Sequence, residues 1–247
     1  FESVLGESLD GFDDEFDDYL KDRFRSPLRG LVQLGEPLGP TASTSELEDF
    51  LRSNPGDLVA RLRLGAMLVG EERFDEAESH LEEAVRIFPE YGGGDSPHWY
   101  LAQIHRARGD LQQAVASLER LTQYSESAYD AFVMQADLLV ELGRPEAAAL
   151  ALDKAVLVWP YDTALHLQLA ELNTEVGFFD GAVRERAAVV ALAPTDMAEA
   201  HYLLAVAYRD ADDRVNARRS LLRALDLAPN YEEALELLLE LRARAGN

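Results

Sequence analysis

Small and apolar residues recur at a fixed interval along most of this chain. Leucines fall at three- and four-residue steps, which is the spacing of one face of an α-helix. Prolines that would end a helix repeat every 34 or 35 residues, from Pro55 to Pro89 and from Pro160 through Pro194 to Pro229. The pattern predicts an all-α chain of repeated helix pairs. Five alanines stand 37, 34, 34 and 35 residues apart, at Ala77, Ala114, Ala148, Ala182 and Ala217.

The repeats align in a single register. Their eighth and twentieth residues are always small, so we expect the paired helices of each unit to cross there. Their seventh and twenty-fourth residues are mostly leucine and should form the core, with Gln135 and Arg186 as the exceptions. The five units begin at Leu58, Asp95, Tyr129, Thr163 and Ala198.

Shorter helical segments flank the five units. Residues 41–57 fit a half unit, in which Ser43 and Glu46 have the spacing of a capping box. Residues 232–247 fit a capping helix, which the end of a repeat stack needs for a polar outer face. Its apolar side should consist of Leu235, Leu237, Leu238, Leu239 and Leu241.

The first forty residues differ from the rest. Residues 9–24 predict a helix with aromatic residues on one face and aspartates on the other, and residues 26–40 predict a Pro- and Gly-rich linker. We expect residues 1–40 to be separate from a repeat domain at 41–247. We also expect the aromatic face and the apolar linker to dock on the N-terminal end of the repeats. These residues are Phe12, Phe16, Tyr19 and Phe24 in the helix and Leu28, Leu31, Val32, Leu34 and Leu38 in the linker.

The five units, residues 58–231, resemble the tetratricopeptide repeat family. The first unit carries Leu64-Gly65, Phe74, Ala77, Ala84 and Pro89 at the family's positions. The resemblance implies a right-handed α-solenoid, here with an extra helix at each end. It also implies that the first helix of each unit lines a concave groove that holds a partner segment.

The resemblance places particular residues in that groove. The inward column at the fifth position is apolar throughout, and its flanks are acidic in units three and four. We therefore expect a protein or peptide partner, extended or helical, with apolar anchors and basic residues. The expected groove residues are Leu62, Trp99, Gln103, Arg106, Val133, Asp137, Leu167, Glu171, Tyr202 and Arg209.

Composition narrows the classes of function. A formal net charge of −23 argues against binding to nucleic acid, whose phosphates need clustered cations. The absence of cysteine excludes disulfides and thiolate chemistry, and no apolar run is long enough to span a membrane. Two lysines against 21 arginines, with abundant carboxylates, fit a protein from a salty cytoplasm or a G+C-rich genome. Compartment and oligomeric state leave no signal.

No residue set predicts catalysis, a cofactor or a metal site. His98, His166 and His201 share the fourth position of their units, so they lie on successive helices and should pack rather than bind one metal. Residues 92–94 lack the lysine of a phosphate loop and predict a longer, mobile turn. Arg186 should pair with Glu171 or Glu175, or extend to solvent; a structural network is the expectation, and a binding role is the alternative.

Residues 1–25 carry a weaker resemblance, to the tail of gluzincin-type zinc peptidase-like domains. It rests on the segment from Val4 to Phe24, and an acidic cap helix explains the same residues equally well. The alternative function is thus the C-terminal repeat region of a zinc peptidase-like protein whose catalytic domain lies elsewhere. The His-Glu-x-x-His motif is absent from this sequence. Because the first residue is Phe1, we expect the sequence to be part of a longer chain.

Overall fold

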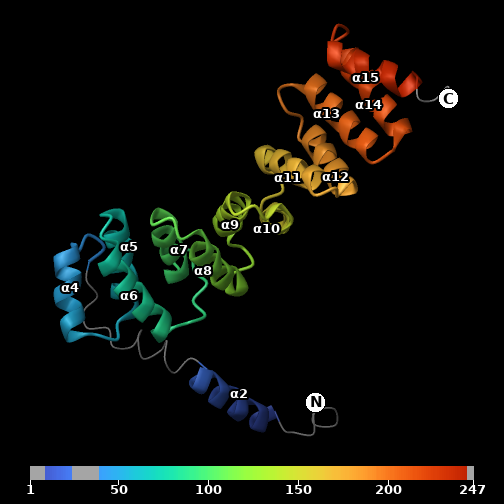
Figure 1. The fold of residues 1–247 in the computed structure, drawn as a ribbon. Coiled ribbons are helices and arrows are strands. Elements are labelled where there is room, and N and C mark those ends of the chain that lie inside the picture. The colour runs from blue at the N-terminus through green and yellow to red at the C-terminus, as the bar shows by residue number, and fades with distance from the viewer. Residues whose placement is uncertain (1–8, 24–38, 244–247) are drawn as a thin grey trace. The chain divides into compact units, whose positions relative to one another are not determined.

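The computed structural model describes residues 9–23 and 39–243, and these contain thirteen α-helices and no β-strand (Figure 1). The predicted all-α, helical-repeat solenoid class is confirmed. The chain forms two compact units, each of which contains several repeats: unit 1 is Phe1–Ser125 and unit 2 is Glu126–Asn247. From here on, unit refers to these two parts, and the predicted helix pairs are called repeats. Their boundary lies in the turn where Glu126 stands at the position that carries proline in the other four repeats. The domain boundary expected at residue 40 stays a prediction.

Each predicted repeat is a pair of helices. In unit 1 the helices are α2 (Leu9–Arg23), α4 (Thr44–Ser53), α5 (Leu58–Gly70), α6 (Phe74–Ile87), α7 (Pro97–Ala107) and α8 (Leu111–Tyr124). In unit 2 they are α9 (Tyr129–Glu141), α10 (Pro145–Val158), α11 (Thr163–Glu175), α12 (Phe179–Ala191), α13 (Met197–Asp210), α14 (Arg214–Leu227) and α15 (Glu232–Ala243).

The small columns mark the helix crossings, as the register predicts. All five alanines at the twentieth position are at most 1% exposed. At the eighth position of the first repeat, a Cβ added to Gly65 would lie 2.6 Å from Cδ2 of Leu81 on α6. The missing Cβ of Gly65 therefore leaves room for the Leu81 side chain where α5 and α6 cross.

The turn inside each helix pair has one recurring backbone feature. The fifteenth residue of every repeat has a positive φ, which favours glycine because it has no Cβ. Three repeats have Gly109, Gly143 and Gly177 there, whereas Glu72 and Asp212 occupy it in the first and last repeats.

Aspartate and serine caps start many of the helices. Ser43 and Glu46 form the predicted capping box: the Ser43 amide donates to Glu46 Oε2 at 2.8 Å, and the Glu46 amide donates to Ser43 Oγ at 3.3 Å. Asp57, Asp162 and Asp196 accept amide hydrogen bonds at the starts of α5, α11 and α13. Part of the acidity of the chain therefore serves helix capping.

Helix α2 matches the predicted N-terminal helix, and its described aspartates are exposed. Its Phe16 and Tyr19 rings stack with centroids 6.4 Å apart and are 49% and 57% exposed. For these two rings the expected burial against the repeats is therefore not seen. Arg23 forms an ion pair with Glu90. The side chain of Phe12, together with Phe24 and the apolar linker, lies outside the described residues.

The last helix has a narrower apolar side than the sequence predicts. Ala234, Leu237, Leu238 and Leu241 are buried in a cluster with residues of α14. Leu235 and Leu239 are 41% and 63% exposed, so the expectation that they belong to the buried side is wrong. A run of leucines obscures the helical period, and only the positions that contact α14 are covered.

The glycine insertion forms a longer turn between α6 and α7, as predicted. The Tyr91 hydroxyl donates to Asp95 Oδ1 at 2.5 Å, and Ser96 Oγ donates to the Tyr91 carbonyl at 2.8 Å. A Cβ on Gly92 would lie 2.7 Å from the Tyr124 carbonyl oxygen. The turn therefore packs against the end of α8, and Gly92 permits that approach.

Candidate functional site

A groove runs along one face of unit 2, between the first helices of the fourth and fifth repeats. It consists of two hollows of about 280 and 330 Å³, which share Glu171, Arg186 and Leu203. We call it the α11–α13 groove. Its lining is Thr163, Leu167, Glu171, Thr174, Glu175, Arg186, Val189, Pro194, Asp196, Glu199, Ala200, Leu203, Val206, Ala207 and Asp210.

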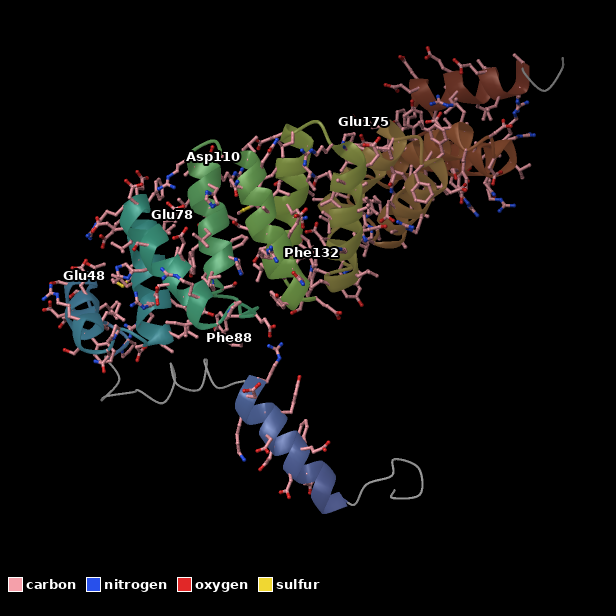
Figure 2. All side chains as sticks on the ribbon, turned by 60° about the horizontal axis from the view of Figure 1, so that its bottom comes forward. Glu48, Glu78, Phe88, Asp110, Phe132 and Glu175 are labelled. Atoms are coloured by element: carbon pink, nitrogen blue, oxygen red, sulfur yellow. The ribbon has the colours of Figure 1, made fainter. Side chains whose placement is uncertain are left out.

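The walls and rim of the groove differ in chemistry. Leu167, Val189, Leu203 and Val206 give it an apolar lining. Five carboxylates stand around this lining, on α11, on α13 and at the cap of α13, namely Glu171, Glu175, Asp196, Glu199 and Asp210. Glu175, labelled in Figure 2, is the last residue of α11. The rim therefore favours a cationic ligand with apolar side chains.

Arg186 of α12 lines the groove, and the neighbouring repeats have leucine at the equivalent position. Its side chain is 12% exposed, and one guanidinium nitrogen lies 3.7 Å from Glu171 Oε1. Burial lowers the pKa of the Arg186 guanidinium, while the charges of Glu171 and Glu199 oppose that shift. The predicted contact with Glu171 is present, but it is longer than a hydrogen bond, and the Glu171 side chain is 73% exposed.

Several residues expected in a groove line this one. Leu167 and Glu171 of the expected set do so. Five further residues on the same first helices also line it, namely Thr174, Glu175, Glu199, Val206 and Asp210. Sequence reasoning did not place Val189, Asp196 or Leu203 there. Asp196 stands one position before its helix, and Val189 belongs to the second helix of its repeat, so columns drawn on first helices omit both.

Three of the four other expected residues of unit 2 have contacts within the unit. Asp137 accepts a hydrogen bond from Gln168 Nε2 at 3.2 Å, and Arg209 Nε donates to Asp210 at 2.8 Å. Tyr202 packs against Tyr231, with ring centroids 5.1 Å apart. Val133 is half-buried. A role for these residues in partner binding stays a prediction.

In unit 1 the expected groove residues vary in exposure. Trp99 and Gln103 are half-buried and Arg106 is exposed. Leu62 is 4% exposed, in a cluster with Leu58 and Ala84, so little of its side chain faces a partner, and its role in binding stays a prediction. The bulky residues Ile87, Phe88 and Tyr91 pack against that cluster.

The histidine column has a structural explanation. Ring nitrogens Nε2 of His98 and His166 lie 3.4 and 3.1 Å from the carbonyl oxygens of Pro89 and Pro160, in the turn before each repeat. The Nδ1 atom of His166 also lies 2.6 Å from Oε2 of Glu185, and both side chains are buried. His98 and His166 thus connect the start of their repeats to the preceding turn, as the packing interpretation predicted.

Sequence reasoning missed Glu185, although the repeat register contains a signal for it. Glu185 is the twenty-third residue of its repeat, and this column faces the fourth. The same two columns hold Arg61 and His80 in the first repeat, 3.5 Å apart. In the third repeat they hold Phe132 and Ala151. Polar residues at both the fourth and the twenty-third positions of one repeat could have identified the pair of His166 and Glu185.

Metal and membrane chemistry find no geometric support in the described part of the chain. Residues 9–23 and 39–243 contain no group of three or more His, Asp or Glu side chains that could hold a metal ion. Within the same residues, no helix combines the length and the apolar character needed to cross a bilayer.

Comparison with known proteins identifies the repeats. Three models of the tetratricopeptide repeat match residues 57–127, 100–166 and 198–231, which together exceed half of the chain. The chain belongs to the tetratricopeptide repeat family. The resemblance of residues 1–25 to a gluzincin tail finds no support in these comparisons, and no curated protein matches the chain significantly.

Solved structures share the fold. The crystal structure of YrrB, described as a TPR protein with an unusual peptide-binding site, is 21% identical to this chain with a TM-score of 0.56. The match covers 79% of this chain and 98% of YrrB. A chain in the structure of Naa15/Naa10 bound to HypK-THB is 17% identical with a TM-score of 0.59, over 77% of this chain and 30% of its own length. Membership of this family and the shared fold support the interpretation of the chain as a protein-interaction scaffold.

Proposed function

We propose that this chain is a non-catalytic interaction scaffold and that the α11–α13 groove holds a segment of a partner protein. The segment carries apolar side chains and basic residues. The single observation that carries the proposal is the combination of an apolar lining with five surrounding carboxylates in one groove. Grooves on helical scaffolds bind segments through apolar anchors, and the charges on their rims select the partner.

The charge of the rim gives the proposal its direction. Among the residues that the structure describes, Arg186 is the one cation that lines the groove, against Glu171, Glu175, Asp196, Glu199 and Asp210. A segment with an excess of Lys or Arg would relieve repulsion among these carboxylates, and an acidic segment would increase it. The apolar lining supplies affinity through burial, at about 25 cal/mol per Å² of apolar surface removed from water.

The test uses a synthetic twelve-residue peptide of Lys, Leu and Ala, blocked at both ends and labelled with a fluorophore. Fluorescence anisotropy at 150 mM salt measures its Kd for the full chain. The double variant Glu171→Gln/Glu199→Gln should weaken binding about two- to thirty-fold, since each of the two exposed charge pairs contributes about 0.2–1 kcal/mol.

A matched control separates the groove from the general acidity of the chain. The double variant Glu236→Gln/Glu240→Gln removes the same charge from exposed positions on α15 of the same unit. It should change the Kd less than two-fold. Equal effects of the two double variants would overturn the proposal, because the peptide would then follow net charge and not the groove.

A further inference from the structure

Arg186 is out of place in two respects. It occupies the twenty-fourth position of its repeat, where the other four repeats carry Leu81, Leu118, Leu152 and Leu221, all fully buried. It also lines both hollows of a groove whose rim is otherwise acidic. A charged side chain at a buried leucine position loses its hydration, and this costs free energy unless the charge is paired or hydrogen-bonded.

The protein provides little of that compensation. A guanidinium has five N–H donors in a planar fork that matches a carboxylate in a bidentate pair. Among the described residues, the ion pair of Arg186 is with Glu171 at 3.7 Å, beyond hydrogen-bond distance. Glu171 is 73% exposed, so its carboxylate is hydrated and loosely held. The guanidinium thus retains donors for an acceptor that enters the groove.

Resting on the proposed function, we infer that the partner segment inserts an aspartate or glutamate side chain that pairs with Arg186, with basic residues on either side of it. The charges around Arg186 favour this pattern. Arg186, Glu171 on α11 and Glu199 on α13 line the same hollow, and the charges of both carboxylates act on the guanidinium. A lone carboxylate would meet their repulsion, whereas a carboxylate flanked by Lys or Arg satisfies all three groups.

Size agrees with a side chain as the inserted group. Arg186 lines both hollows, which measure about 280 and 330 Å³. Both volumes stand at the lower limit of pockets that hold whole small-molecule ligands. Such a hollow accommodates one carboxylate side chain and the apolar part of its neighbour, so the remainder of the segment lies along the groove.

The experiment is selection from a phage-displayed library of random twelve-residue peptides on the full immobilised chain. The wild type should enrich peptides with Asp or Glu between basic residues. One enriched peptide is then synthesised with its acidic residue and with the amide counterpart. For the wild type, the amide should bind about ten- to a hundred-fold more weakly, as expected for loss of a charge-assisted hydrogen bond pair.

The variant Arg186→Leu tests whether Arg186 causes the preference for the acidic peptide. Leucine is the residue of the other four repeats at this position, so the variant should fold and melt like the wild type or better. Its preference for the acidic peptide over the amide should fall to about one-fold. Arg218→Leu, on exposed surface of α14 outside the groove, should keep the wild-type preference.

The outcomes separate the two proposals. Enriched peptides that are basic without an acidic residue, weakened by Glu171→Gln/Glu199→Gln but not by Arg186→Leu, would overturn the role of Arg186 and leave the groove intact. Peptides insensitive to all groove variants, or no enriched peptides, would overturn the proposed function and this inference with it.

Discussion

The buried pair of His166 and Glu185 allows a quantitative test of how the fourth repeat is held together. The two side chains are 6% and 2% exposed, and His166 Nδ1 lies 2.6 Å from Glu185 Oε2. Arg184 Nε donates to Glu185 Oε1 at 2.5 Å. In Glu185→Ala, the histidine nitrogen stays buried without an acceptor.

The expected loss follows from these contacts. A hydrogen bond to a charged group contributes about 1.5–3 kcal/mol, and a buried polar group left unsatisfied costs about 1–3 kcal/mol. Removing one member of a buried pair costs about 3–5 kcal/mol in total. Arg184 adds little to the loss because it keeps Asp153 at 2.6 Å. We therefore expect Glu185→Ala to lower the free energy of unfolding by about 3–5 kcal/mol.

The third repeat supplies a matched control for this variant. Its fourth and twenty-third residues are Phe132 and Ala151, so the double variant His166→Phe/Glu185→Ala recreates a pair the fold already accepts. Replacing both partners of a buried pair by apolar groups is often neutral. The double variant should recover at least half of the loss, which is about 2 kcal/mol relative to Glu185→Ala.

Urea unfolding followed by circular dichroism measures these free energies. Repeat proteins can unfold in parts, so the midpoint and slope of the transition are compared together. A loss below about 1 kcal/mol for Glu185→Ala would refute the reasoning. So would a double variant no more stable than Glu185→Ala, since the cost would then come from the site and not from the unpaired histidine.

Three further predictions concern the whole repeat array. Ala148→Leu should overpack the crossing of α9 and α10 and cost about 1–3 kcal/mol, and an unchanged melting temperature would contradict the repeat register. Gly143→Ala, at φ 67°, should cost about 1–2 kcal/mol, whereas Glu72→Gly, at φ 59°, should gain up to about 1 kcal/mol; urea unfolding with both changes of one sign would exclude backbone strain as the cause. With a net charge of −23, the melting temperature should rise clearly from low to molar potassium chloride, and a flat response would exclude carboxylate repulsion as a major term.

The repeat register could be predicted from the sequence because all five repeats have the same packing requirement at the same position. Ala77 to Ala217 are buried because a helix crossing admits only a small side chain, and that requirement repeats with the chain. The capping box at Ser43 was predictable for a similar reason, since both of its hydrogen bonds lie within four residues. Local geometry and repetition are both readable without a structure.

Contacts outside the repeating pattern could not be predicted. Leu62 occupies an inward column, but its burial depends on Phe88 and Tyr91 beyond the next helix. The groove position of Arg186 depends on α11, α12 and α13 together, whereas its sequence position indicates only that a leucine is missing. The exposure of Leu239 depends on which side of α15 packs against α14, since Leu238 and Leu241 of the same helix are buried there. Each of these is set by a neighbour and not by the period.

The location of a bound partner segment tests the central claim most directly. The probe is the Lys, Leu and Ala peptide with a photoreactive benzophenone group, crosslinked to the full chain and mapped by mass spectrometry. The account predicts crosslinks in α11 and α13, in peptides that contain Leu167 or Leu203, and their loss in the Glu171→Gln/Glu199→Gln variant. Crosslinks concentrated instead on the exposed apolar residues Leu157, Trp159 and Tyr161, which are 83%, 56% and 71% exposed, would contradict it.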